Sequence, residues 1–407
     1  MSTATPQDIG HAAATLAASP ADYDTWLHLA GLLAAAGRRQ ESETAFLELG
    51  RAGCAVGQVA LAVACARWLD LRDLAVAGVL IDQIVKVHAA GSKQIDPAAR
   101  PKPPPAAAAP PTVRPPASMD TAVAAATKAI AQAGKAAAAR APATYPPTPL
   151  VSSLPADDVK TLIGVMQPSA LPRGHVVVEV GAPATHLYWI ARGAVQVSRD
   201  EHILGELLPG SFFGEIALVG GGNRTGTVTC TLDTWLLAIP AAEIEAMAAK
   251  HPRLAKALAR HARARLLANV MKTSELFAQL SEEDKAELLG RFETVMVPAG
   301  NRFITRAANN DHLWVVVSGQ CEVRHGDTLI ETLGPGDGIG EISLLAQKPA
   351  TADVIAIKPT ALLRLARAEF DQVAVKYPQL LAEVYKLLVA REQELKRLVH
   401  DASDLVV

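Results

Sequence analysis

The stretch Phe213-Gly214-Glu215-Ile216-Ala217-Leu218, followed after a short gap by Arg224-Thr225-Gly226-Thr227-Val228, is the part of the sequence around which the rest is organised. Gly214 lets the backbone approach a ligand closely, and Glu215 places one carboxylate in an apolar run. A buried cyclic phosphodiester needs backbone N–H groups and a guanidinium for its anionic oxygens, and a carboxylate for a ribose hydroxyl. Glu215 and Arg224 supply the two charged groups, so the stretch predicts a site for a small cyclic anion.

This stretch resembles the phosphate-binding cassette of the cyclic-nucleotide-binding domain family, which includes the bacterial catabolite activator protein and the regulatory subunit of cAMP-dependent protein kinase. The resemblance implies that Arg224 pairs with the exocyclic phosphate oxygens and that Glu215 accepts a hydrogen bond from the ribose 2′-hydroxyl. Backbone N–H groups near Ala217 and Thr225 would complete the anion site at the start of a short helix. The predicted ligand is cAMP or cGMP, and the predicted binding residues are Phe213, Gly214, Glu215, Ile216, Ala217, Arg224 and Thr225.

Residues 150–397 form a tandem repeat with a constant interval, since Glu215 corresponds to Glu341 (341 − 215 = 126). The same interval relates Gly174 to Gly300, Gly193 to Gly319, Gly210 to Gly336, His186 to His312 and Val228 to Val354. Short runs of β-branched and aromatic residues, punctuated by glycine, predict strands, and helical patterns follow them. The two histidines, each before a strand, are expected to be turn or core residues. The resemblance implies two antiparallel, jelly-roll-like β-rolls flanked by helices, over residues 149–273 and 274–407.

The second copy keeps part of the site and loses its cation. Ala350 stands at the position of Arg224, and Asp353 at that of Thr227. A cavity that keeps a carboxylate without a cation disfavours an anion, because an unpaired phosphate is costly to desolvate and Asp353 adds negative charge. The second domain is therefore interpreted as a packing or relay element with a degenerate site consisting of Gly340, Glu341 and Thr351.

Residues 1–95 show the apolar periodicity of helices, at Trp26, Leu29, Leu33, Phe46 and Leu49. The pattern resembles one tetratricopeptide repeat, a helix–turn–helix of about 34 residues. Asp22 or Asp24 is expected to cap its first helix, and a second helix pair is expected near residues 57–67 and 73–87. This α-helical hairpin module is predicted either to hold a partner peptide or to serve as a small dimerisation or capping module.

Residues 96–148 change abruptly to a composition rich in proline and alanine. Such a segment predicts an extended, semi-rigid tether. Residues 119–139 contain no proline and predict a solitary helix with few large apolar side chains to dock it. Residues 103–116 could alternatively serve as a motif for proline-recognising modules. The whole chain is thus predicted to be an α+β multidomain protein.

Bulk properties exclude several classes of protein. The formal net charge is −2, with 39 Lys and Arg against 41 Asp and Glu, so no global basic field favours nucleic acid or an anionic membrane. No apolar run approaches the roughly 20 residues that span a bilayer, and no secretory signal is visible at the N-terminus. The four cysteines are far apart and lack metal-ligand spacing, which indicates free thiols in a cytoplasmic protein without a metal site.

No phosphate-loop, kinase or nucleophile-elbow motif is present, so we expect no catalytic residues, no enzyme activity and no cofactor apart from the bound nucleotide. The favoured hypothesis is a cytoplasmic regulatory or adaptor protein in which the first roll binds cAMP or cGMP. Ligand would shift the helical stretch over residues 253–280, and residues 1–95 would hold a protein partner of unknown identity or form a homodimer. The alternative is a scaffold whose rolls bind no ligand and only contact other proteins.

Overall fold

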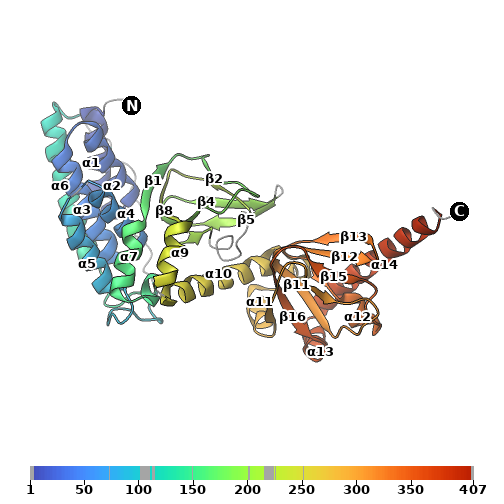
Figure 1. The fold of residues 1–407 in the computed structure, drawn as a ribbon. Coiled ribbons are helices and arrows are strands. Elements are labelled where there is room, and N and C mark those ends of the chain that lie inside the picture. The colour runs from blue at the N-terminus through green and yellow to red at the C-terminus, as the bar shows by residue number, and fades with distance from the viewer. Residues whose placement is uncertain are drawn as a thin grey trace. The chain divides into compact units, whose positions relative to one another are not determined.

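The computed structural model describes residues 4–72, 74–100, 111, 115–148, 150–199, 202–214, 224, 226–250 and 252–404. The chain divides into two compact units, Met1–His261 and Ala262–Val407. The first unit combines a helical module with one β-roll, and the second contains another β-roll with its own helices (Figure 1). The predicted fold class, helices followed by two antiparallel rolls, is confirmed.

In the described residues the helical module consists of the helices α1 (Pro6–Ala18), α2 (Tyr23–Ala35), α3 (Arg39–Val56), α4 (Val59–Asp70), α5 (Val76–His88) and α6 (Met119–Ala139). Helices α1 to α5 each pack against the next along the chain, and α6 packs against α1 and α3. Asp22 caps α2 by accepting a hydrogen bond from the N–H of Thr25 at 3.0 Å. The helix pair expected near residues 57–67 and 73–87 is present as α4 and α5, whereas α1 was not predicted.

Helix α6 docks on the module, which corrects the prediction of a solitary helix in an extended tether. It packs against α1 and α3 (Figure 1). Its buried residues are mostly alanines: Ala122, Val123, Ala126, Ala129, Ile130, Ala133 and Ala137. Small side chains let neighbouring helices approach closely, so α6 buries a face without large apolar residues. Beyond α6, the Tyr145 hydroxyl donates to the carbonyl oxygen of Ala55 at 2.8 Å, so residues 119–145 belong to the module; much of the proline-rich part before them lies outside the described residues.

The first roll is formed by two antiparallel sheets, with strand orders β1-β8-β3-β6 and β2-β7-β4-β5. In the described residues its strands are β1 (Gln167–Leu171), β2 (Val176–Val178), β3 (His186–Arg192), β4 (Val195–Arg199), β5 (His202–Leu207), β6 (Phe212–Phe213), β7 (Thr227–Cys230) and β8 (Thr234–Pro240). The 3₁₀ turn η1 (Val151–Ser153) and helix α7 (Ala156–Val165) precede them. Helices α9 (Ala241–Lys250) and α10 (Pro252–Thr273) follow.

The second roll repeats the first strand for strand, with sheet orders β9-β16-β11-β14 and β10-β15-β12-β13. Its strands are β9 (Glu293–Val297), β10 (Arg302–Ile304), β11 (His312–Ser318), β12 (Cys321–His325), β13 (Thr328–Leu333), β14 (Gly338–Ile339), β15 (Asp353–Ala356) and β16 (Thr360–Ala366). Each begins and ends at the sequence interval of the repeat, as with β1 and β9 (293 − 167 = 126). The remaining elements are η2 (Glu275–Phe277), α11 (Glu282–Leu289), α12 (Glu341–Ala346), α13 (Arg367–Lys376) and α14 (Pro378–Asp404).

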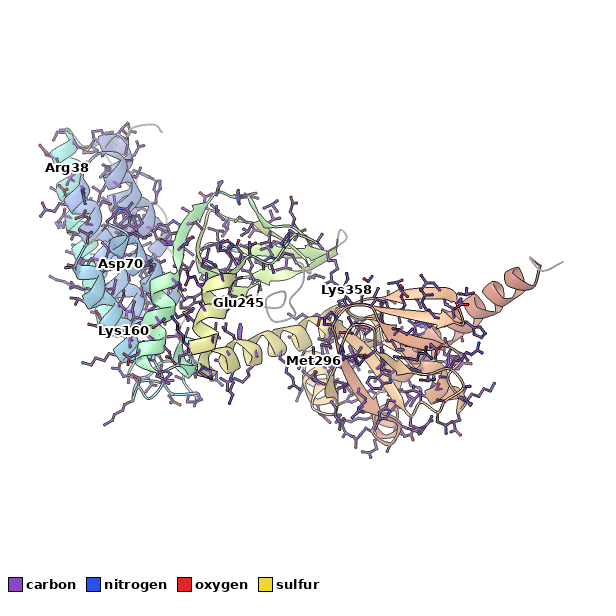
Figure 2. The ribbon with its side chains drawn as sticks, viewed as in Figure 1. Arg38, Asp70, Lys160, Glu245, Met296 and Lys358 are labelled. Carbon is purple, nitrogen blue, oxygen red and sulfur yellow. The ribbon has the colours of Figure 1, made fainter. Side chains whose placement is uncertain are left out.

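The helical module and the first roll share one hydrophobic core. Helix α4 packs against β1, β3 and β8. The ring of Phe46 stacks on Trp68 and on Trp235 of β8, with centroids 3.7 Å and 5.7 Å away. Buried Arg67 donates to the carbonyl oxygen of Met166 at 2.8 Å and pairs with Asp70. Asp70, which is labelled in Figure 2, is the last residue of α4. The helical module and the first roll are therefore packed directly against each other, whereas the sequence predicts an extended tether between them.

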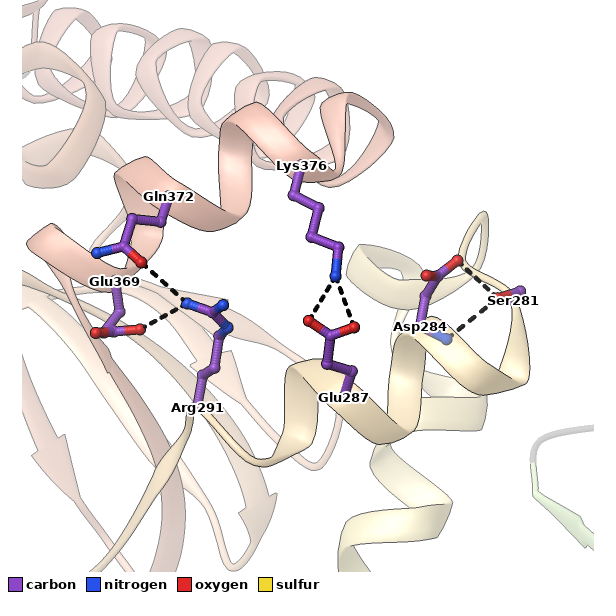
Figure 3. A network of polar contacts seen from close by, with 7 residues as sticks. All are labelled: Ser281, Asp284, Glu287, Arg291, Glu369, Gln372 and Lys376. Atoms are coloured by element: carbon purple, nitrogen blue, oxygen red, sulfur yellow. Dashed lines mark hydrogen bonds and ion pairs between the residues drawn. The ribbon is translucent and has the colours of Figure 1, made fainter.

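Polar contacts join α13 to α11 and the residues that follow it in the second unit (Figure 3). Lys376 lies 2.6 Å from both carboxylate oxygens of Glu287, and Arg291 Nη1 lies 2.9 Å from a carboxylate oxygen of Glu369. Exposed pairs of this kind contribute at most about 1 kcal/mol each. The apolar core beneath them therefore supplies most of the stability of this unit.

The described helices include none with both the length and the hydrophobicity needed to cross a bilayer. The four cysteines are free and buried. No cluster of three or more potential metal ligands occurs among the described residues.

Candidate functional site

The first roll places Phe213 and Gly214 at the end of β6. Phe213 pairs with Tyr188 of β3, and their rings stack with centroids 4.9 Å apart. Gly214 follows with φ of +92°, a left-handed conformation that favours glycine. The chain therefore turns sharply where the predicted ligand-binding stretch begins.

Arg224 points inward, and only 5% of its surface is exposed. Its Nη2 donates to the carbonyl oxygen of His186 at 2.7 Å, and its Nη1 donates to that of Gly214 at 3.2 Å. The backbone around it is held as well, because the Arg224 N–H donates to the carbonyl oxygen of Ala182 at 2.8 Å. The guanidinium carbon lies 5.7 Å from the centroid of the Tyr188 ring. Main-chain atoms thus fix a buried cation beside Gly214.

Gly214 makes room for this cation. A Cβ atom at this position would lie 2.4 Å from Arg224 Nη1 and 3.0 Å from the His186 carbonyl oxygen. Both the backbone conformation and the position of the guanidinium therefore require glycine. The sequence pattern predicts a close approach of the backbone to a ligand, and the structure shows a close approach to the guanidinium of Arg224.

The environment of Arg224 affects two neighbouring side chains. Burial and the nearby guanidinium lower the pKa of His186, so this imidazole is neutral at pH 7. Burial raises the pKa of Tyr188. Because both side chains are neutral at pH 7, neither His186 nor Tyr188 adds to the positive charge of Arg224 or offsets it.

The structure brings together three of the predicted site residues, Phe213, Gly214 and Arg224. The others, Glu215, Ile216, Ala217 and Thr225, lie outside the described residues. His186 was expected to be a turn or core residue; it is the first residue of β3, and its carbonyl oxygen anchors the arginine.

In the second roll Asn310 occupies the place of the missing cation. Its Nδ2 donates to the carbonyl oxygen of His312 at 2.8 Å, the counterpart of the His186 bond. Its Oδ1 accepts from Nε1 of Trp314 at 3.1 Å. A Cβ atom on Gly340, whose φ is +91°, would lie 2.5 Å from this Nδ2. A neutral amide thus replaces the guanidinium, and Ala350 is buried.

Asp353 does not add charge to the second site, which corrects the interpretation from sequence. Its carboxylate accepts from the N–H of Arg306 at 2.8 Å and lies 3.2 Å from Arg302. In the first roll the hydroxyl of Thr227 accepts from the N–H of Val180 at 3.1 Å. Thr227 and Val180 are the counterparts of Asp353 and Arg306 at the interval of the repeat (353 − 227 = 126; 306 − 180 = 126). Asp353 therefore caps the same turn as its counterpart.

The residues of the degenerate site do come together, around a cavity of about 430 Å³. Gly340, Glu341 and Thr351 line it together with Ala350 and part of α14. Buried Glu341 pairs with Arg391 of α14, whose Nη1 lies 3.1 Å from its Oε2. The second roll thus keeps a cavity and a buried carboxylate.

Sequence reasoning missed Asn310 and Arg391. Asn310 carries no signal of its own, because its counterpart in the first copy is Ala184. Arg391 does carry one, since it matches Arg265 at the interval of the repeat (391 − 265 = 126). Extending the repeat beyond the strands would have singled out this arginine.

Comparison with known proteins agrees with this geometry. The family model of the cyclic nucleotide-binding domain matches residues 168–251 and 294–377. The two matches begin one repeat apart (294 − 168 = 126). Each covers the strands of one roll and the helix that follows them.

Similar proteins include the cGMP-dependent protein kinase egl-4 of Caenorhabditis elegans, 26% identical over 230 residues, which are 55% of this chain and 28% of that protein. The cAMP-dependent protein kinase regulatory subunit of Eremothecium gossypii is 24% identical over 226 residues, 55% of this chain and 47% of that protein. The chain thus spans less than half the length of either relative. A solved structure of the regulatory domain of Toxoplasma gondii PKA with cAMP is 22% identical, covering 60% of this chain and 92% of that one, with a TM-score of 0.28.

Proposed function

Because the chain carries two tandem cyclic nucleotide-binding domains, we propose that it is a regulatory protein that responds to cAMP or cGMP. The first roll binds the nucleotide, and the second roll does not. The buried guanidinium of Arg224 carries this proposal. Catalysis is not part of it, since the matching family model describes a ligand-binding domain.

Arg224 suits a cyclic phosphate because it is held in place before the ligand arrives. Its two bonds to the carbonyl oxygens of His186 and Gly214 fix the plane of the guanidinium. A guanidinium is permanently charged and presents five N–H donors in a planar fork, which matches the oxygens of a phosphate. In the proposal Glu215 accepts from the ribose, and backbone N–H groups near Ala217 and Thr225 complete the site.

A path from the site to the following helix supports a regulatory role. Phe212 precedes Phe213 in β6, and its ring meets the edge of His261 on α10 with centroids 5.7 Å apart. A change at β6 therefore reaches α10, the start of the stretch over residues 253–280. Ligand shifts this helix only if it binds one arrangement of the helix better than another.

The helical module supplies the surface for a protein partner in this proposal. Three apolar side chains at the turn between α4 and α5 and on α5 are exposed: Leu71, Val76 and Val79. In the proposal these exposed side chains supply apolar area for a protein contact. The same surface would serve a homodimer, and the near-neutral net charge favours neither nucleic acid nor a membrane. The free buried thiols are consistent with a cytoplasmic location.

Isothermal titration calorimetry of the full chain with cAMP and with cGMP tests the proposal. We expect one of the two to bind, and Arg224→Ala to weaken its binding by one to two orders of magnitude. This range follows from roughly 1.5–3 kcal/mol for hydrogen bonds to a charged group. Arg364→Ala is the matched control, because Arg364 also lies 5.7 Å from an aromatic centroid, in the second roll.

The scaffold hypothesis makes the opposite prediction. Heat from neither nucleotide, or equal affinities for wild type and Arg224→Ala, would reject nucleotide binding by the first roll. Equal losses in Arg224→Ala and Arg364→Ala would show that removing any arginine weakens binding nonspecifically. A normal thermal transition for both variants excludes misfolding as the cause.

A further inference from the structure

The second roll contains a cavity that the proposed function does not use. Its volume of about 430 Å³ lies in the range of ligand pockets, roughly 300–1,000 Å³. The inner faces of the strands supply apolar walls, including Ile304, Val323 and Val354. Glu341, Ser343 and Thr351 are polar residues of the lining.

The charges around this cavity differ in sign from those at the first site. The charged lining residues are Glu331, Glu341 and Arg391, so one guanidinium faces two carboxylates and the formal sum is −1. Arg391 lies 3.1 Å from a carboxylate oxygen of each glutamate. At the matching positions of the first roll, Gly205 replaces Glu331 and Arg224 replaces Ala350. A phosphate in this cavity would meet negative potential and no uncommitted cation among the lining residues.

We propose that the second roll binds an uncharged ligand of nucleoside size, with hydroxyl groups on one side of an apolar ring system. The carboxylate of Glu341 accepts hydrogen bonds from two neighbouring hydroxyls, as a carboxylate has lone pairs for both. Ser343 and Thr351 also line the cavity and each carries a hydroxyl that can donate or accept. The ring system packs against the apolar strands, where neither Ala350 nor Asn310 offers a charge to an anion.

Helix α14 lines part of the cavity and gives a second readout. It contributes Leu387, Ala390 and Arg391 to the lining. The guanidinium of Arg391 also donates to the carbonyl oxygen of Gly338 at 2.5 Å, which ties the helix to β14. A ligand beneath α14 adds contacts to this helix, so the amides of residues 378–391 exchange more slowly when it is bound.

The experiment uses the full chain carrying Arg224→Ala, the variant in which we expect the first roll to lose its binding of cyclic nucleotide. Adenosine, guanosine, cAMP and cGMP are titrated into it by calorimetry. We expect one of the nucleosides to bind at one site per chain, at least tenfold more tightly than the matching cyclic nucleotide. Glu341→Gln lowers this affinity at least tenfold, Ala350→Phe abolishes it by filling the cavity, and Glu293→Gln, an exposed control, leaves it unchanged.

Three results would overturn the proposal: no saturable heat from either nucleoside, tighter binding of a cyclic nucleotide, or nucleoside binding that survives Ala350→Phe. The inference does not depend on the first roll, because nucleotide binding there is measured separately in the wild type. If the second roll binds no nucleoside, nucleotide binding by the first roll can still hold, and the reverse is also true. Nucleoside-dependent protection of α14 in hydrogen exchange provides independent support, and its absence at saturation counts against the site.

A reciprocal exchange tests the charge argument directly. The triple variant Asn310→Ala, Glu331→Gly and Ala350→Arg carries the residues of the first roll at these three positions. In the Arg224→Ala background we expect it to gain at least tenfold in affinity for a cyclic nucleotide and to lose its preference for the nucleoside. A folded triple variant, with the thermal transition of its parent, that gains no such affinity contradicts the argument.

Discussion

The two rolls differ in the side chain that donates to one equivalent backbone carbonyl oxygen. The carbonyl oxygen of His186 receives a guanidinium N–H from Arg224, and that of His312 receives an amide N–H from Asn310. The guanidinium is permanently charged, whereas the amide is neutral and its oxygen already accepts from Trp314. The equivalent carbonyl oxygen therefore accepts a side-chain hydrogen bond in both rolls, but only in the first roll is the donor positively charged.

At this scale Gly214→Ala provides a test of how Arg224 is placed. A Cβ atom would lie 2.4 Å from Arg224 Nη1 and would displace the guanidinium. We expect cyclic-nucleotide affinity, measured by calorimetry, to fall at least tenfold. The control is Gly210→Ala, since Gly210 has a φ of +90° and a Cβ atom there would meet no other atom within 4 Å. It carries the same backbone strain without the clash, and equal losses in both variants would refute the placement.

His88 gives a pH dependence to the stability of the first unit. Burial lowers the pKa of His88 to about 4, and its Nε2 lies 3.3 Å from the carbonyl oxygen of Cys54. Below about pH 6.5 the unfolded chain takes up a proton that the folded chain does not. The free energy of unfolding therefore falls as the pH drops, by roughly 2–3 kcal/mol between pH 7 and 4.5.

Urea denaturation of wild type and His88→Leu at these two pH values measures this effect. The variant should lose less stability than the wild type between pH 7 and 4.5, because it lacks the titrating group. His11→Leu, at an exposed position of α1, should behave as the wild type. An unchanged pH dependence in His88→Leu would rule out a role for this histidine.

At the scale of elements, α6 shows why a helix was misjudged from sequence. Its docked face is nearly all alanine, and a search for large apolar side chains finds few. Alanine loses no side-chain entropy on burial, so close packing of small side chains stabilises the contact at little cost. The sequence of helix α4 indicates its burial more clearly than that of α6. Residues 59–66 are all apolar, which is the pattern of a helix buried on every side.

The docking of α6 is tested by placing a charge in its buried face. Ala133 is fully buried, so Ala133→Glu forces an unpaired carboxylate into the contact with the module or undocks the helix. We expect the free energy of unfolding to fall by roughly 3 kcal/mol or more. Ala131→Glu, at an exposed position of the same helix, should stay within about 0.5 kcal/mol of the wild type. Similar urea midpoints for both variants would mean that α6 is not docked in solution.

Across the whole molecule, the tandem repeat was predictable and the joining of the module to the first roll was not. Glycines at turns and alternating strand residues recur at a fixed interval because both copies form the same turns and strands. The register of the repeat is therefore visible in the sequence. Contacts between segments far apart in sequence, such as Phe46 with Trp235, leave no periodic signal. The replacement of Arg224 by Asn310 was hidden for the same reason, as the two positions lie in different loops.

The number of cyclic nucleotide molecules bound per chain at saturation tests the central claim most directly, because the rolls share a fold and only the first carries the buried cation of Arg224. Equilibrium dialysis of the full chain with labelled cAMP or cGMP gives this number. We expect one molecule per chain for the nucleotide that binds, and we expect Arg224→Ala to bind none at the same concentration. Two molecules per chain, none, or one that persists in Arg224→Ala would contradict it.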